Sequence, residues 1–192
     1  MDEPKHPLRQ GNLLKGMTSD LRKGACWGLS VQWLLECVSG SPSVAGLAMT
    51  VGTTAYEAIL RHAEHANEFL AGTDDDASIG NCTLILSGMK LDAVRRDIVD
   101  TKGHLTTAVS IIAAMDERIF HGLIVLSCPR GRHAMAVANY RNTWALFDPN
   151  FGTWTYAGCA MGAPTSFSRL LVDVFEYYAV TEVKLFTIHR LQ

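Results

Sequence analysis

A chain of 192 residues with 48% apolar side chains is long enough for one well-packed domain and too short for two domains to be the default. Its net charge of −2 gives no general attraction to nucleic acid or to an anionic membrane. No apolar run approaches the roughly 20 residues that cross a bilayer, and the polar start MDEPKH lacks the apolar core of a signal peptide.

The cysteines point to a reducing compartment. There are five of them, an odd number, and their spacing is not paired, which argues against a disulfide framework. We expect three of them to be small core residues: Cys82, Cys128 and Cys159.

Residues 1–18 mix prolines and glycines with charge and show no sustained periodicity. This composition predicts a flexible N-terminal tail. The remaining residues, 19–192, are expected to form one folded domain.

The stretch from Gly24 to Val38 is the first with a strong pattern, because it is almost wholly apolar. A helix with so few polar residues is enclosed by the protein on most sides. Cys26 stands where the helical pattern begins, and the free N–H groups and dipole of a helix start favour a thiolate. The pattern therefore predicts a reactive cysteine, although a buried structural cysteine fits it as well.

The middle of the chain is less distinctive. Helical spacing predicts a helix over 53–71, and a segment over 81–87 fits either a short helix or a buried strand. His62 and His65 lie three residues apart within the first of these, but no third metal ligand has a recognisable spacing, so we expect surface histidines. A further helix is predicted over 105–115.

From residue 120 the apolar period changes from helical spacing to two, which predicts a run of consecutive strands. A helical stripe and a last strand follow them. Helices followed by an antiparallel sheet make an α+β fold. The strands are expected over 120–127, 132–140, 143–148, 151–156 and 182–189, and the helix over 166–179. Three aromatic residues are expected to pack in the sheet: Trp144, Trp154 and Tyr156. Trp154 follows the loop after Asp148, and it is therefore also a candidate for the border of a cleft.

The hairpin formed by residues 132–140 and 143–148 brings a histidine and an aspartate together. The sum of facing residue numbers in an antiparallel pair is constant, so an even-numbered turn puts His133 and Asp148 on one face of the sheet. A turn at Tyr140-Arg141, or a four-residue turn around it, would set them directly opposite, with Cβ atoms about 5 Å apart. An odd-numbered turn would separate them onto two faces.

A carboxylate beside an imidazole fixes the tautomer and orientation of the ring and stabilises its cation. The other ring nitrogen is then free to take a proton from a thiol. A structural hydrogen-bonded pair would show the same spacing. Together with a cysteine at a buried helix, the pair favours nucleophilic catalysis by Cys26, His133 and Asp148.

Three motifs carry a specific resemblance: GACWGLS at 24–30 followed by a Trp-Leu pair, RHAMA at 132–136, and FDPNFG at 147–152. In this order they resemble the YopT/AvrPphB-type cysteine peptidases, papain-like enzymes found among bacterial type III effectors injected into host cells. The resemblance covers the chain from about residue 24 to its end. It implies a papain-like fold, in which a helical lobe with a central catalytic helix packs on an antiparallel sheet.

The same resemblance assigns roles to the three residues. Cys26 would be the nucleophile, His133 the general base and then the general acid, and Asp148 the residue that orients the imidazole. It implies a cysteine endopeptidase that hydrolyses a host protein through an acyl-enzyme and needs no cofactor or metal. As a virulence effector, it would be secreted without a signal peptide and act in the host cytosol.

The chain departs from papain-like enzymes in one respect. These enzymes use a side-chain amide a few residues before the cysteine to help bind the oxyanion, and no Asn or Gln stands between Met17 and Cys26. The backbone N–H of Cys26 is expected to be one donor, and the second is expected from another main-chain N–H, the Ser19 hydroxyl or a protonated Asp20. Losing one such donor costs about 3 kcal/mol of transition-state stabilisation. Trp27, beside the nucleophile, is a candidate for a wall of the cleft.

Two other functions fit the same residues. A glutamine deamidase or an acyltransferase would use the same triad on a different acyl group or acceptor. A catalytically weak pseudo-peptidase would only bind a host protein, as the missing amide suggests. Neither alternative involves nucleic acid or a membrane span.

Overall fold

The structure is a computed structural model of the chain. It describes residues 1–9, 19–38, 91–98, 103–115, 119–140, 142–158 and 163–190, and of residues 19–24, 91–98 and 189–190 only the backbone. The predicted helix over 53–71, with His62 and His65, and the segment over 81–87 lie outside the described residues, as do Cys82 and Cys159.

The described residues form helices and strands in nearly the predicted places. The helices are α2 (Ser19–Val38), α5 (His104–Ala114) and α6 (Thr165–Tyr178). The strands are β1 (His6–Pro7), β2 (Leu91–Ile98), β3 (Ile119–Cys128), β4 (Gly131–Tyr140), β5 (Thr143–Asp148), β6 (Gly152–Ala157) and β7 (Glu182–Arg190). The predicted strands between residues 120 and 156, the helices at 105–115 and 166–179 and the last strand are confirmed within two residues at each end.

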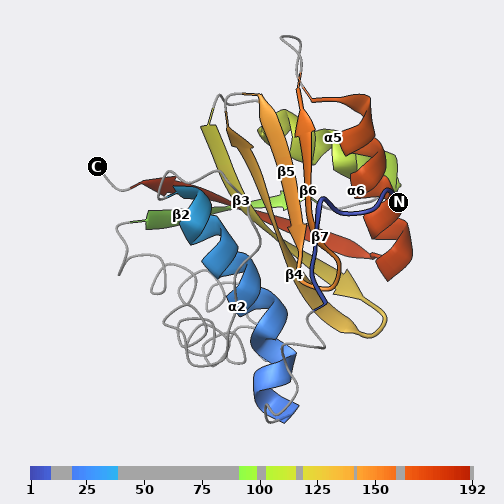
Figure 1. Cartoon of the computed structure of the whole chain (residues 1–192). Helices are drawn as coiled ribbons and strands as arrows, with labels where there is room; N and C mark the ends of the chain where they lie inside the picture. Colours follow the sequence, from blue (N-terminus) through green and yellow to red (C-terminus); the bar gives the residue numbers. More distant parts are fainter. Residues whose placement is uncertain are drawn as a thin grey trace.

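The strands of the described residues form one sheet in the order β1-β6-β5-β4-β3-β7-β2, and each neighbouring pair is antiparallel. Strands β3 to β6 are consecutive neighbours joined by short turns, whereas β7 returns to the far side of β3 (Figure 1). This is the antiparallel sheet of an α+β protein, as predicted.

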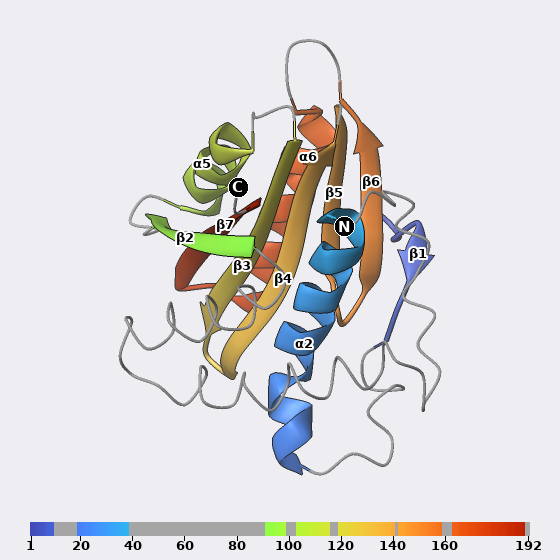
Figure 2. The same cartoon turned by 90° about the vertical axis from the view of Figure 1, so that its left-hand side faces the viewer.

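Helices cover both faces of this sheet. Helix α2 lies across one face, and α5 and α6 lie on the other (Figure 2). Alternate side chains of β4 point to opposite faces of the sheet. Ala134, Ala136 and Ala138 belong to the core between the sheet and α2, and Met135 and Val137 belong to the core between the sheet and helices α5 and α6. Because the three side chains facing α2 are alanines, the large apolar side chains of α2 can pack close to the sheet. No helix in the described ranges is long and apolar enough to cross a membrane.

The first nine residues lie along the edge of the sheet. In the segment that the sequence assigns to a flexible tail, His6 and Pro7 pair with Thr153 and Gly152 of β6. The indole Nε1 of Trp154 donates a hydrogen bond of 2.9 Å to the carbonyl of Asp2. The edge of β6 is therefore covered by a short strand, a common protection against pairing with other chains.

Gly152 is the point at which β1 crowds β6. Its φ is +124°, and a Cβ there would collide with the His6 carbonyl and come within 2.8 Å of Pro7 Cα. Gly131 has a similar φ of +122° but open space around it. We expect Gly152→Ala to lower the free energy of unfolding by about 1–3 kcal/mol more than Gly131→Ala, and to expose residues 1–9 to limited proteolysis. Equal effects of the two substitutions in urea unfolding would mean that β1 does not restrict this position.

Candidate active site

Helix α2 carries Cys26 in its interior, which corrects the position expected from the sequence. The helix begins at Ser19, seven residues earlier, so about two turns precede Cys26. The N–H of an interior residue bonds to the carbonyl four residues before it, and the effect of the dipole falls off within the first turn. The expectations of a thiolate stabilised by a helix start, and of the Cys26 N–H as an oxyanion donor, are therefore wrong for this helix.

Ser19 and Asp20, the other oxyanion candidates, lie in the first turn of α2. At 1.5 Å of rise per residue they are about 10 Å from Cys26 along the helix axis. The fold thus does not bring these two positions to the thiol, and their side chains lie outside the described residues.

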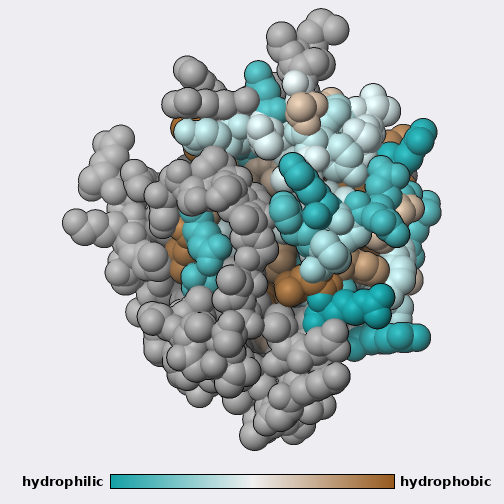
Figure 3. Space-filling view, in the orientation of Figure 1, coloured by the Kyte–Doolittle hydropathy of each residue, from teal (hydrophilic) through white to brown (hydrophobic). Residues whose placement is uncertain are grey.

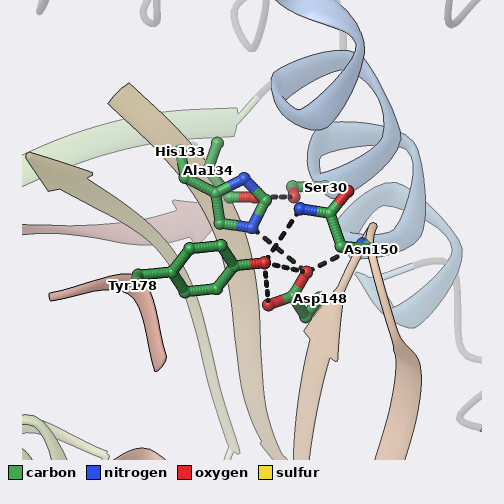
Figure 4. Close-up of polar contacts among 6 residues, drawn as sticks. All are labelled: Ser30, His133, Ala134, Asp148, Asn150 and Tyr178. Carbon is green, nitrogen blue, oxygen red and sulfur yellow. Dashed lines mark hydrogen bonds and ion pairs between the residues drawn. The ribbon is translucent and has the colours of Figure 1, made fainter. Parts of the chain in front are cut away.

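The thiol of Cys26 sits against the sheet. Its residue is 4% exposed and belongs to the core between α2 and the sheet. One turn further along the helix, the Ser30 hydroxyl donates a hydrogen bond of 3.1 Å to the carbonyl of Ala134, directly after His133 (Figure 4). This buried bond fixes the distance between the helix that carries the cysteine and the strand that carries the histidine.

His133 and Asp148 lie on one face of the sheet, as the hairpin argument predicts. The imidazole Nε2 is 3.1 Å from Asp148 Oδ1, and the two side chains are 9% and 0% exposed. The prediction that they are directly opposite is wrong. Tyr140 pairs with Thr143, so the chain turns between these two residues, and the register places His133 and Asp148 diagonally.

The β4–β5 ladder ends at the pair Ala136–Phe147. In this ladder His133 and Asp148 lie beyond the last paired residues, although His133 still pairs with Leu126 of β3 and Asp148 with Gly152 of β6. Because Nε2 faces Asp148, Nδ1 is the ring nitrogen left for the thiol of Cys26.

The pKa of His133 reflects both neighbours. Burial disfavours the cation and would lower the pKa, but the charge and hydrogen bond of Asp148 raise it, as do the hydrogen bond and charge of Cys26. The balance raises the pKa of His133 to about 10. The imidazole is then protonated at neutral pH.

The buried carboxylate of Asp148 is held by further donors. The backbone N–H of Asn150 donates to its Oδ1 at 2.8 Å. The hydroxyl of Tyr178 lies 3.2 Å from Oδ1 and 3.0 Å from Oδ2. Such hydrogen bonds satisfy a carboxylate that is shielded from water.

Tyr178 is the residue that the sequence analysis missed. It comes from the end of α6, and its ring stacks on the imidazole of His133 with centroids 4.5 Å apart and an interplanar angle of 30° (Figure 4). Its hydroxyl accepts a hydrogen bond of 2.8 Å from the side-chain amide of Asn150. Burial, followed by the charge of Asp148, raises the pKa of Tyr178, so the hydroxyl keeps its proton and donates it to the carboxylate.

The tryptophans lie in the core. Trp27, the candidate cleft wall, is 1% exposed and packs between α2 and the sheet. Trp144 and Trp154 are equally buried on the α6 side, where Trp154 is tied to the N-terminal segment. Tyr156 lies beside them, half-buried. The described part of the chain holds no group of three His, Cys, Asp or Glu side chains arranged for a metal ion.

A pocket of about 640 Å³ adjoins His133 on the side of the β3–β4 turn. It is lined by residues 128–133, Asn150 and the end of α6 from Tyr177 to Ala179. Burial raises the pKa of Cys128 in its wall, and the charge of Cys26 adds to this effect.

A helix that presents a cysteine to a histidine–aspartate pair at the end of an antiparallel sheet is the arrangement of a cysteine peptidase. Comparison with known proteins agrees with this class. Residues 8–160 match the Peptidase_C58 family, described as Yersinia/Haemophilus virulence surface antigen, and the chain belongs to this family. No curated protein sequence matches the chain.

A solved structure shows the same fold. The Pseudomonas avirulence protein AvrPphB is similar with a TM-score of 0.71 and 16% identity over 92% of this chain and 99% of that chain. The predicted papain-like α+β fold is thereby confirmed. The ubiquitin-specific protease of murine cytomegalovirus tegument protein M48 also matches, with a TM-score of 0.46 and 10% identity over 98% and 85% of the two chains. Family and fold make this protein a cysteine peptidase.

Proposed function

We propose that Cys26, His133 and Asp148 are the catalytic triad of this peptidase. The observation that supports the proposal most directly is the 3.1 Å contact of His133 Nε2 with Asp148, which leaves Nδ1 for Cys26. Burial lowers the pKa of His133, but Asp148 and Cys26 raise it to about 10. This value fits a thiolate–imidazolium pair at neutral pH.

The reaction follows from these charges. The Cys26 thiolate attacks the scissile carbonyl, and the His133 imidazolium gives its Nδ1 proton to the leaving amine as the C–N bond breaks. The product is a thioester on Cys26. The now neutral imidazole takes a proton from a water molecule, which attacks the thioester and releases the acid, and the pair is restored.

We further propose that the substrate is a host protein and that the enzyme is a virulence effector. It would be secreted and act in the host cytosol. The description of the family as a virulence surface antigen, and of a structural relative as an avirulence protein, support this setting.

The test compares host-cell lysate treated with the wild type and with Cys26→Ala, and maps new protein termini by mass spectrometry. We expect discrete new termini with the wild type only, and Cys37→Ala on the same helix should behave as the wild type. A gain of about one dalton in an intact protein, without new termini, would indicate a deamidase. An effect that persists in Cys26→Ala would indicate a binding protein and contradict the proposal.

Tyr178 is proposed as a positioning residue, since it touches both Asp148 and His133. Tyr178→Phe keeps the ring on the imidazole but removes the donor to a buried carboxylate. A hydrogen bond to a charged group contributes about 1.5–3 kcal/mol, so kcat should fall roughly tenfold or more with little change in KM. The basic limb of the pH–rate profile should also move to higher pH, because the imidazolium then faces a less satisfied carboxylate.

Tyr156→Phe is the matched control for this measurement. It removes another tyrosine hydroxyl that bonds an aspartate, Asp2, at 3.4 Å, far from the site. We expect the same kcat and pH profile as in the wild type. A fall in thermal stability of Tyr178→Phe without a change in the pH profile would mean that Tyr178 is only structural.

A further inference from the structure

The pocket beside His133 is open to solvent on a part of the surface that carries positive charge. Its rim is the β3–β4 turn, where Arg130 and Arg132 are both exposed and both line the pocket. Hydrophilic residues gather at the lower right of the surface in Figure 3, where Figure 1 places the end of the β3–β4 hairpin. The opposite wall is the end of α6.

The two arginines have no acidic partner in the described part of the chain. Glu182, the acidic residue closest to the turn along β7, accepts a hydrogen bond of 2.8 Å from Ser127 and lies 3.8 Å from Lys184. Asp148 lies beneath His133 and Tyr178 and is engaged by both. Among the described residues, the pocket therefore offers two guanidinium groups without an acidic partner, which suit a carboxylate.

The chemistry of the site fixes which part of a substrate reaches this pocket. The general acid must stand next to the leaving amine, so the leaving part of the peptide lies on the imidazole side of the thiol. Since His133 is itself part of the pocket wall, the residues that follow the scissile bond run toward Arg130 and Arg132.

We propose that this pocket is a subsite for an acidic side chain, Asp or Glu, at one of the first three positions after the cleaved bond. The inference rests on the proposed function and names a substrate class for the same site. A contact between exposed charges is modest, so the expected preference for Glu over Lys in kcat/KM is about tenfold. It should shrink as ionic strength rises.

The test uses peptides built on a cleavage site found in the lysate, with Glu or Lys at each of the three positions. We measure the Glu/Lys ratio of kcat/KM for the wild type, for the double variant Arg130→Gln/Arg132→Gln, and for Arg132→Glu. The ratio should fall to about one in the double variant and below one in Arg132→Glu, because the added carboxylate attracts lysine.

Arg169→Gln is the matched control, because Arg169 is an exposed arginine on α6 outside the pocket. Its Glu/Lys ratio should equal that of the wild type. A wild-type ratio of one at all three positions, or a preference that survives in the double variant, would overturn the subsite. Failure of the wild type to cleave any peptide or lysate protein would instead overturn the proposed function.

Discussion

Cys26→Ala and His133→Ala are each expected to lower kcat/KM by at least about 10⁴-fold, and the double variant is expected to be no slower than either. The reason is that, in the proposed triad, sulfur and imidazole work as one ion pair. Without His133 the thiol lacks the cation that favours its ionised form, and the leaving amine lacks a proton donor. Without Cys26 the imidazolium has no nucleophile to assist. Steady-state kinetics of the three variants on one cleavable protein tests this non-additivity.

Cys37→Ala is the control in the same helix. Burial, followed by the charge of Glu36, raises the pKa of Cys37 to about 12, so its thiol stays protonated at neutral pH. Its loss should leave kcat/KM unchanged within about twofold, since it takes no part in the ion pair. Additive losses from Cys26→Ala and His133→Ala would contradict a coupled pair. All variants should be compared at equal folded fraction by thermal unfolding.

The face shared by His133 and Asp148 is predictable because of the period of two in a strand. The turn lies one residue later than expected, between Tyr140 and Thr143, and Asn142 takes a positive φ of 69°. A shift of the turn by one residue changes the sum of paired numbers by two and so leaves both side chains on the same face. The sequence therefore predicts the pair but not its diagonal geometry.

The start of α2 is not predictable in the same way. An apolar pattern marks the part of a helix that is buried, and the residues from Ser19 to Lys23 carry no apolar stripe that would reveal a helix. The sequence therefore suggests a start near Cys26, about two turns too late. The argument from the helix dipole fails with it, and in the proposed triad the imidazolium of His133 would support the thiolate instead.

The role of Tyr178 depends on packing across the whole domain. The helical stripe that includes it is visible in the sequence, and α6 is confirmed. Only the packing of α6 on the sheet, however, brings its last residue over an imidazole 45 residues earlier in the chain. The same holds for Arg130 and Arg132. Their proposed role depends on a pocket whose other wall is the end of α6, and the sequence does not reveal that pocket.

Asp148→Asn is expected to move the basic limb of the kcat/KM profile to lower pH by about 1–3 units. This limb reports the loss of the imidazolium from the free enzyme. In the wild type, burial lowers the pKa of His133, but Asp148 and Cys26 raise it to about 10, so activity declines only above that pH. An asparagine keeps a hydrogen-bond acceptor for Nε2 but removes the negative charge. Burial is then opposed less strongly, and the pKa of His133 falls.

The pH dependence of the loss of activity in Asp148→Asn distinguishes stabilisation of the His133 cation from orientation of the ring. If Asp148 only orients the ring, Asp148→Asn lowers activity by the same factor at every pH. If its charge stabilises the cation, the loss is small near pH 6 and reaches roughly tenfold or more near pH 9. Asp173→Asn, which removes a carboxylate that pairs with the N-terminal amine at 2.8 Å, should leave the limb in place. A uniform loss in Asp148→Asn would show that the cation of His133 does not depend on this carboxylate, and the thiolate–imidazolium pair would then need another source of stabilisation.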